Sequence, residues 1–428
     1  MNAQPLSRRS FLKTVAIAGA ALQARPLFGQ PAPSGRKLKI GLVGCGGRGR
    51  GALANALEAA PLAGVELEIF ALADVFSDNT TVVGEKFGVP PERRFVGFDA
   101  YRQVLEQPID LVFLATPPNF RPVHFEAAIA AGKHCFIEKP VAVDPPGARR
   151  ILAAGESART KGLSVVAGAQ RHYMANYLRN AHAVHAGAIG RITGGTVMWN
   201  QPQLWFKERR EGESDAHYLA RNWVNFLEMS GDHIVEQHFH NLDVANWFIG
   251  DTPVAAIGFG GRVRRKTGNQ YDFFSVDFDY GQGCHIHSSC RQINGCYNRV
   301  GESFIGTEGT VHADGKLETF AKTPVEFQEF TTHPNGMVQE HVELLRSIVA
   351  ERPLNDTRHV ADSTLTAIMG RISAYTGQMV RWSDLTNPGA AYYDLRLSPS
   401  AEQFEQGEVV APAENVVPMP GSEERQPA

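Results

Sequence analysis

One glycine-rich turn constrains this chain more than any other feature of its sequence. Alternating apolar residues at positions 38, 40 and 42 predict a strand, which runs directly into the pattern Gly-x-Gly-x-x-Gly at positions 44–49. After the turn, apolar residues at positions 53, 56, 57 and 60 have the spacing of one helix face. A strand, a glycine turn and a helix in this order form the first unit of a parallel sheet that holds a dinucleotide.

Each glycine of the turn has a separate physical role in such a site. Gly44 allows the tight turn, Gly46 lets the backbone approach a pyrophosphate, and Gly49 lets the helix pack closely on the strand. The helix N-terminus adds N–H donors and a positive dipole. The predicted cofactor-binding residues of the turn are Gly44, Cys45, Gly46, Gly47, Arg48 and Gly49.

An acidic residue ends the next expected strand, at 67–73. Asp74 lies where a carboxylate accepts hydrogen bonds from the ribose diol of a dinucleotide. The same charge repels a 2'-phosphate, so we expect NAD rather than NADP. Arg48 and Arg50 beside the turn leave NADP as the alternative, since either could neutralise that phosphate.

Further strand-to-helix units follow, and their ends carry a specific set of motifs. A strand at 111–115 runs into Thr116-Pro117-Pro118, and a strand at 134–137 begins at Gly132-Lys133-His134 and ends in Glu138-Lys139-Pro140. With the glycine turn, these motifs resemble the Gfo/Idh/MocA family, named for glucose-fructose oxidoreductase, inositol dehydrogenase and rhizopine catabolism proteins.

The resemblance implies roles for these residues. It places Lys139 beside the reacting hydroxyl and the nicotinamide, with a cis bond before Pro140, and it places Thr116, Pro117, Pro118 and Glu138 against the cofactor. Independently of the family, a lysine at the carboxyl end of a parallel strand lies where open sheets bind ligands.

The resemblance also implies the overall architecture. We expect an α/β chain with an N-terminal Rossmann dinucleotide-binding domain at 36–165, and an α+β substrate domain with a large, mainly antiparallel open sheet at 166–385. Family members commonly associate through that sheet, which predicts a homo-oligomer. Locally, alternation at 271–280, the turn 281–283 and alternation at 284–290 predict a hairpin.

The candidate acid–base residues lie in the pattern Glu236-x-x-x-His240-x-x-Asp243. On one helix, Glu236 and His240 share a face, and a carboxylate beside an imidazole raises its pKa and orients it as a general base. The family pattern that this stretch resembles has Asp in place of Glu236. The longer Glu side chain leaves open whether Glu236 touches substrate or supports His240.

A sugar is held by aromatic faces against its C–H patches and by planar polar groups on its hydroxyls. The residues predicted to face such a substrate are Arg171, Tyr173, Trp205, Arg221, Asn222, Trp223 and Asp243.

We predict no metal site. No His-Glu-x-x-His spacing exists, and on a helix His238 is turned about 160° from His240. In a strand, Cys284 and Cys290 face away from His285 and His287.

The N-terminal segment, 1–35, is expected to be a targeting peptide. It has no acidic residue, and Arg8, Arg9 and Lys13 precede an apolar run at 14–24, a pattern that resembles the twin-arginine export signal. The twin-arginine translocase is therefore an expected partner, with a periplasmic location. No later apolar run reaches the roughly 18 residues of a membrane span.

The C-terminal segment, 386–428, is rich in proline and acid and is expected to be an extended tail. Its Tyr392, Tyr393 and Phe404 could dock on the body or on a neighbouring subunit, or the tail could be partly disordered.

Composition excludes other classes of protein. Lys and Arg total 42 against 45 Asp and Glu, so nothing drives the chain toward nucleic acid. An odd count of five cysteines argues against a disulfide framework.

These observations predict an exported oxidoreductase that transfers hydride between NAD and a hydroxyl of a sugar, polyol or glycoside. Free NAD is scarce outside the cytoplasm, so we expect the cofactor to be tightly held. Two alternatives stay open: a glycoside hydrolase that oxidises a sugar transiently at C3, and a non-catalytic protein that binds a sugar or nucleotide.

Overall fold

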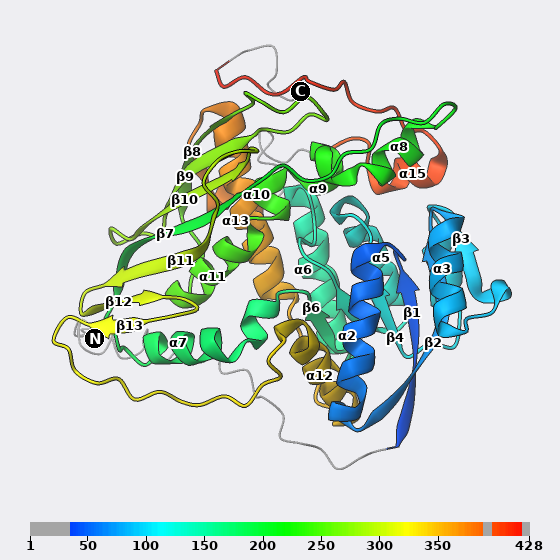
Figure 1. Cartoon of the computed structure of the whole chain (residues 1–428), viewed down its shortest axis with the longest axis horizontal. Coiled ribbons are helices and arrows are strands. Elements are labelled where there is room, and N and C mark those ends of the chain that lie inside the picture. Colours follow the sequence, from blue (N-terminus) through cyan, green and yellow to red (C-terminus); the bar gives the residue numbers. More distant parts are fainter. Residues whose placement is uncertain (1–34, 388–395, 422–428) are drawn as a thin grey trace, which may run out of the picture.

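The computed structural model describes residues 35–387 and 396–421. Figure 1 shows a parallel-sheet domain, a broad second sheet, and helices between the two. The predicted targeting segment up to residue 34, and Tyr392 and Tyr393 of the predicted tail, lie outside the described residues.

The first domain is built on a parallel sheet. Its strands are β1 (Arg36–Val43), β2 (Val65–Asp74), β3 (Arg94–Val96), β4 (Leu111–Leu114), β5 (His134–Ile137) and β6 (Val165–Ala167). The described strands lie in the order β3-β2-β1-β4-β5-β6, so the chain reverses direction across the sheet between β1 and β4. Ligands of open parallel sheets bind at the carboxyl ends of the strands beside such a reversal.

Helices cover both faces of this sheet, because its strands are buried apolar runs. They are α2 (Gly47–Ala63), α3 (Ser77–Phe87), α4 (Ala100–Leu105), α5 (Arg121–Ala130), α6 (Pro145–Thr160) and, from much later in the chain, α12 (Gly336–Val349). Val338, Val342 and Leu345 of α12 share an apolar cluster with Leu53 of α2. The first domain therefore includes a helix from the far end of the chain.

The second sheet is large and mixed. Its strands are β7 (Ile192–Gln201), β8 (Ala255–Gly261), β9 (Phe273–Asp279), β10 (His285–Gln292), β11 (Arg299–Gly306), β12 (Gly309–His312), β13 (Leu317–Thr319) and β14 (Val380–Arg381). In the described ranges the order is β13-β12-β11-β7-β10-β9-β8-β14, and only the β7–β10 pair is parallel. The predicted hairpin is confirmed as β9–β10, with His285 opposite Asp279.

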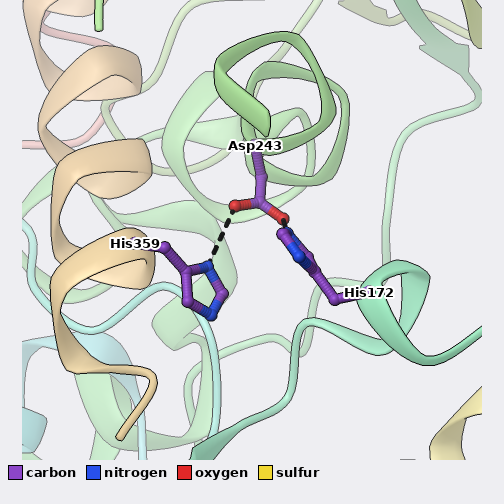
Figure 2. Close-up of side chains that lie close together, drawn as sticks. All are labelled: His172, Asp243 and His359. Atoms are coloured by element: carbon purple, nitrogen blue, oxygen red, sulfur yellow. Dashed lines mark hydrogen bonds and ion pairs between the residues drawn. The ribbon is translucent and has the colours of Figure 1, made fainter. Parts of the chain in front are cut away.

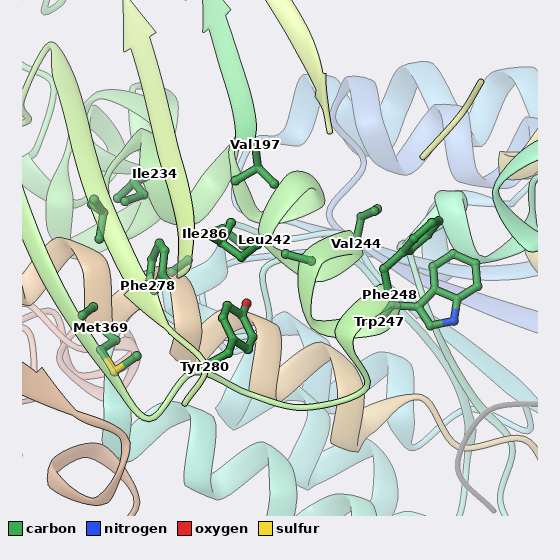
Figure 3. Close-up of a cluster of buried hydrophobic side chains, with 14 of the residues drawn as sticks. Val197, Ile234, Leu242, Val244, Trp247, Phe248, Phe278, Tyr280, Ile286 and Met369 are labelled. Atoms are coloured by element: carbon green, nitrogen blue, oxygen red, sulfur yellow. The ribbon is translucent and has the colours of Figure 1, made fainter. Parts of the chain in front are cut away.

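Helices fill the space behind this sheet. They are α7 (Ala175–His185), α8 (Asp215–Arg221), α9 (Leu227–Ser230), α10 (His233–Glu236), α11 (Phe239–Ile249) and α13 (Thr357–Thr376). Figure 3 shows Leu242 and Phe248 of α11 among the buried apolar side chains, with Phe278 and Ile286 of the sheet. The long helix α13 contacts β8 on one side and α6 of the first domain on the other. The predicted fold class is thus confirmed.

Short helical turns complete the structure. They are η1 (Pro91–Arg93), η2 (Pro118–Phe120), η3 (Gln170–Tyr173), η4 (Trp223–Asn225), α14 (Trp382–Thr386) and α15 (Ala401–Gln406). All five cysteines are free thiols, and four of them are buried. Among the described helices, none combines the length and apolar character needed to cross a membrane.

The described part of the tail docks on the body of its own chain. Phe404 on α15 is 2% exposed, and its ring lies 5.1 Å from that of Phe98 and 4.9 Å from that of Phe120. Polar contacts surround this ring: Arg102 pairs with Glu405 at 2.8 Å, and Tyr101 donates to the same carboxylate at 3.0 Å. Residues 396–421 are therefore part of the folded unit.

We expect Phe404→Ala to lower the free energy of unfolding by about 3 kcal/mol, because it removes a buried ring and leaves a cavity. Val410→Ala is the control, since Val410 is 77% exposed, and should change stability by no more than about 0.5 kcal/mol. Urea unfolding curves of both variants measure the difference. Equal stability of the two would show that burial of the Phe404 ring does not stabilise the fold.

Candidate active site

The glycine turn has the geometry of a dinucleotide cradle. Gly44 has φ +95°, and a Cβ there would lie 2.8 Å from the Ala115 carbonyl, while a Cβ on Gly49 would lie 1.9 Å from the Gly44 oxygen. No other residue fits these two positions. A Cβ on Gly46, by contrast, would meet no protein atom within 4 Å. Backbone N–H groups at the start of α2 are thus left open to a phosphate, which fits NAD.

Asp74 lies at the end of β2 and stabilises this turn through a hydrogen bond to its backbone. Its carboxylate accepts from the Cys45 N–H at 2.7 Å, from the Phe76 N–H at 2.9 Å and from the Asn79 amide at 3.1 Å. Burial raises the pKa of Asp74, and these donors oppose that rise. The Val75 N–H is a further donor to this carboxylate, so Asp74 is firmly held beside the turn.

Arg48 of the turn pairs with a carboxylate at the end of β5. Its Nε lies 2.9 Å from Oε1 of Glu138, which is buried at the end of β5. The guanidinium charge is therefore matched by a carboxylate, which weakens the NADP alternative that relied on Arg48. Thr116 and Pro117 follow β4 on the same edge, and Pro118 begins η2.

Lys139 follows Glu138, and the Lys139–Pro140 bond is cis, as the resemblance implies. The Lys139 ammonium donates to the Glu236 backbone oxygen at 2.6 Å and to its Oε1 at 3.1 Å. The two side chains are only 13% and 8% exposed. This contact joins the carboxyl edge of the first sheet to α10 of the second domain.

The expected contact between Glu236 and His240 is not formed. Helix α10 ends at Glu236, a turn occupies 237–238, and α11 begins at Phe239, so the two residues do not share one helix face. Instead, Glu236 accepts from Lys139 and from the Gln237 amide. The prediction that Glu236 orients His240 is corrected: a lysine ammonium provides a stronger partner than a neutral imidazole, so Glu236 orients Lys139.

His240 lies in an enclosed environment, with an aromatic ring and charged side chains around it. It is 7% exposed, and its ring stacks on Trp199 with centroids 5.8 Å apart. Burial, followed by the positive charges of Lys139 and Arg171, lowers the pKa of His240 well below 6.5. Its Nδ1 has no hydrogen-bond partner among the described residues. The imidazole is therefore neutral near pH 7 and able to take a proton.

Arg171 lies behind Trp199. Its guanidinium pairs with the buried Glu302 and lies 5.8 Å from the centre of the Trp199 ring. Glu302 also accepts from Tyr177 at 3.2 Å and from Asn241. Arg171 therefore supports the wall of the site with a charge that is already paired.

Four of the residues predicted to contact substrate have side chains that bond other groups of the protein, and their substrate role stays a prediction. The Tyr173 hydroxyl donates to Asp356 at 2.8 Å, and Arg221 pairs with Glu213. Asn222 bonds both backbone groups of Lys207, at 2.8 and 2.9 Å. Asp243 accepts from His172 at 2.8 Å and from Ser363 at 2.8 Å.

Two aromatic candidates remain available. Trp205 is 44% exposed, and its ring meets that of the half-buried Trp223 edge to face, with centroids 6.5 Å apart. Their substrate role stays a prediction, as do the roles of Lys139 and His240.

One residue that the sequence did not single out positions α10. Asp232 is fully buried, has φ +72° and ψ 163°, and accepts from the Tyr271 N–H at 3.0 Å and from the Tyr375 hydroxyl. Such a backbone conformation is otherwise taken almost only by glycine and costs roughly 1–3 kcal/mol. The hydrogen bonds hold it in place, and α10 starts there with Glu236 one turn away.

Two family models match this chain. Residues 38–167 match an oxidoreductase family described as having an NAD-binding Rossmann fold, and residues 177–312 match the GFO/IDH/MocA C-terminal domain. Together the matched ranges contain every residue of the glycine turn, Asp74, Lys139, Glu236 and His240.

Individual relatives are more distant. An inositol 2-dehydrogenase of Paracoccus denitrificans is 29% identical over 219 residues, 51% of this chain and 56% of that protein. A glycosyl hydrolase family 109 protein of Streptomyces coelicolor is 27% identical over 190 residues, 42% of this chain and 39% of that protein. The chain spans about half the length of the curated relatives that it matches.

A solved structure extends the similarity in fold. The aldose-aldose oxidoreductase from Caulobacter crescentus, crystallised with glycerol, aligns with a TM-score of 0.63 at 18% identity. The alignment covers 81% of this chain and 100% of that one. This likeness shows a shared fold.

We expect Gly46→Ala to fold normally and to weaken NAD binding at least tenfold, because the new methyl group meets no protein atom yet blocks the approach of the pyrophosphate. Gly315→Ala is the control, because Gly315 lies between β12 and β13, outside the turn, and a Cβ there would meet only the His312 Cβ at 3.6 Å, an ordinary contact. Calorimetric titration with NAD, together with melting curves, measures both effects. Unchanged NAD affinity in Gly46→Ala would place the dinucleotide elsewhere.

Proposed function

Because the chain belongs to the Gfo/Idh/MocA family of oxidoreductases with an NAD-binding Rossmann fold, we propose that it transfers hydride between NAD and a hydroxyl-bearing carbon of a sugar, polyol or glycoside. The observation that carries this proposal is the enclosed site of Lys139 and His240 beside the open glycine cradle. Similarity to an inositol 2-dehydrogenase supports a polyhydroxylated substrate.

Lys139 polarises the reacting hydroxyl in this proposal. An ammonium group has three donors, and Glu236 takes two of them. The third is left for the substrate oxygen. Glu236 holds the ammonium in place from the opposite domain.

His240 takes the hydroxyl proton. Its depressed pKa keeps it neutral, so a ring nitrogen accepts the proton as the C–H bond of the same carbon breaks. Bound NAD supplies the hydride acceptor. Trp205 and Trp223 offer apolar ring surface to the C–H patches of a sugar.

We propose that this reaction takes place outside the cytoplasm. The proposal rests on the basic cluster and apolar run of residues 1–35, which resemble a twin-arginine signal for export of folded cargo. A protein exported with its cofactor has to hold NAD tightly.

A glycoside hydrolase is the second candidate, favoured by the similarity to the Streptomyces coelicolor glycosyl hydrolase. In that reaction the sugar C3 hydroxyl is oxidised, C2–H becomes acidic and loses its proton, and the aglycone leaves. Water then adds and the hydride returns to C3, so there is no net oxidation. Lys139 and His240 would have the same roles at C3.

The test begins with protein purified from its native location. Denaturation should release about one NAD or NADH per chain, identified by mass spectrometry and absorbance. Loaded protein is then given sugars and aryl glycosides. Reduction of the bound NAD without aglycone release indicates the dehydrogenase, whereas aglycone release without NADH indicates the hydrolase. Failure to bind any added NAD or NADP would exclude both.

We expect Lys139→Met and His240→Gln each to lower kcat by 10²- to 10⁴-fold, the range of acid–base catalysis. The matched controls are Lys316→Met and His287→Gln, because both side chains are exposed on the second sheet or its loops. The controls should stay within about threefold of wild type. If kcat of Lys139→Met or of His240→Gln also stayed within threefold of wild type, the roles assigned to these residues would be wrong.

The pH dependence of kcat/KM tests the environment of His240. Burial, Lys139 and Arg171 all favour the neutral imidazole, so the acid limb should have an apparent pKa below 6.5. Lys139→Met removes one positive charge near His240. The apparent pKa of the acid limb, measured on the remaining activity of this variant, should therefore rise toward 6.5. A wild-type limb at or above 6.5 would contradict this account.

A further inference from the structure

A second cluster of chemically capable side chains lies one turn of α11 beyond His240. His172 of η3, Asp243 of α11 and His359 of α13 point their polar atoms at one another (Figure 2). His172 Nε2 lies 2.8 Å from Asp243 Oδ2, and His359 Nδ1 lies 3.4 Å from Asp243 Oδ1. One potential ligand atom from each residue lies within 4.8 Å of the others. Three separate elements therefore present two imidazoles and one carboxylate to a common point.

This set of donors suits a divalent transition-metal ion. Two histidines and one carboxylate form known zinc and iron sites, which keep further positions for water. Ligand atoms about 2.0–2.2 Å from a tetrahedral zinc lie roughly 3.3–3.6 Å apart. The 3.4 Å between His359 and Asp243 already matches this spacing, whereas the 2.8 Å between His172 and Asp243 would have to lengthen.

His359 and Asp243 have outer contacts of the kind found at metal sites. Ligating histidines commonly contact a carboxylate through their other nitrogen, and ligating carboxylates are themselves hydrogen-bonded. Here, Nε2 of His359 lies 3.7 Å from Asp356 Oδ1, and the Ser363 hydroxyl donates to Asp243 at 2.8 Å. The His172 ring stacks on Trp247 at 4.1 Å, which fixes its orientation.

An ion has a route to this point. The three residues line a cavity of about 1160 Å³ between α7, α11 and the start of α13. Arg358, whose side chain is 78% exposed, also lines it, so the cavity reaches the surface. Its described lining includes neither Lys139 nor His240.

We propose that His172, Asp243 and His359 bind one divalent transition-metal ion, with Zn²⁺ as the ion that best suits these donors. The ion would tie η3 and α13 to α11, the helix on which His240 lies one turn before Asp243. Its role is to position that helix. This proposal does not depend on the reaction or the substrate.

The test uses full-length, untagged protein treated with a chelator and then titrated with Co²⁺, whose visible absorption reports four-coordinate binding. We expect one Co²⁺ per chain, displaced by Zn²⁺. His359→Gln should weaken binding at least tenfold, since this residue is the most exposed of the three and its replacement is least disruptive to folding. His182→Gln is the matched control, because His182 lines the same cavity without belonging to the cluster, and should bind as wild type does.

A measurement on the wild type avoids any folding defect of a variant. X-ray absorption of the zinc-loaded protein should show a first shell of nitrogen and oxygen donors with two imidazoles. No uptake of Co²⁺ or Zn²⁺ at about 100 μM would overturn the proposal and leave a hydrogen-bonded triad. The proposal would also be overturned if His359→Gln bound the metal as tightly as wild type, or if the first shell of the zinc contained sulfur. Either result would place the ion elsewhere.

Discussion

The buried contact between Lys139 and Glu236 fixes the two domains against each other at the candidate active site. A charge removed from water is costly unless it is paired, so neither side chain can stay in this interior without the other. Lys139 is held at the carboxyl end of β5, and Glu236 ends α10, which starts at the strained and tightly bonded Asp232. The pair therefore sets the second domain against the edge of the first sheet where the glycine cradle opens.

The same contact decides the chemistry of the pattern Glu236-x-x-x-His240-x-x-Asp243. Each of the two carboxylates is bound by a partner other than His240: Lys139 holds the first, while His172 and Ser363 hold the second. His240, which lies between Glu236 and Asp243 in the sequence, therefore has no hydrogen bond to either carboxylate. It lies beside Trp199 and near the positive charges of Lys139 and Arg171. A base with a low pKa results, rather than the carboxylate-supported imidazole expected from helical spacing. The turn at 237–238 is the physical cause, because it separates the two residues that an unbroken helix would have placed together.

Several features followed from local sequence because their physics is local. The glycine turn needs residues without a Cβ at Gly44 and Gly49, and that need appears as a short pattern between a strand and a helix. The hairpin of β9 and β10 was likewise visible as alternation around a glycine turn. Asp74 could be placed because the end of β2 lies beside the turn in every sheet of this type. The docking of Phe404 could not be decided in this way, since its partners Phe98 and Phe120 lie in the first domain.

The sequence by itself therefore determined the dinucleotide cradle and the class of both domains. It also indicated Lys139 and His240 as the candidate acid–base groups. Only the tertiary structure decided the partners of the charged side chains. Lys139 and Glu236 are 97 residues apart, and His172 and His359 lie 71 and 116 residues from Asp243. Hydrogen bonds and ion pairs act over a few ångströms in space, whereas sequence patterns report neighbours within a turn or a strand. Which carboxylate a buried cation or imidazole meets is consequently set by the packing of distant elements.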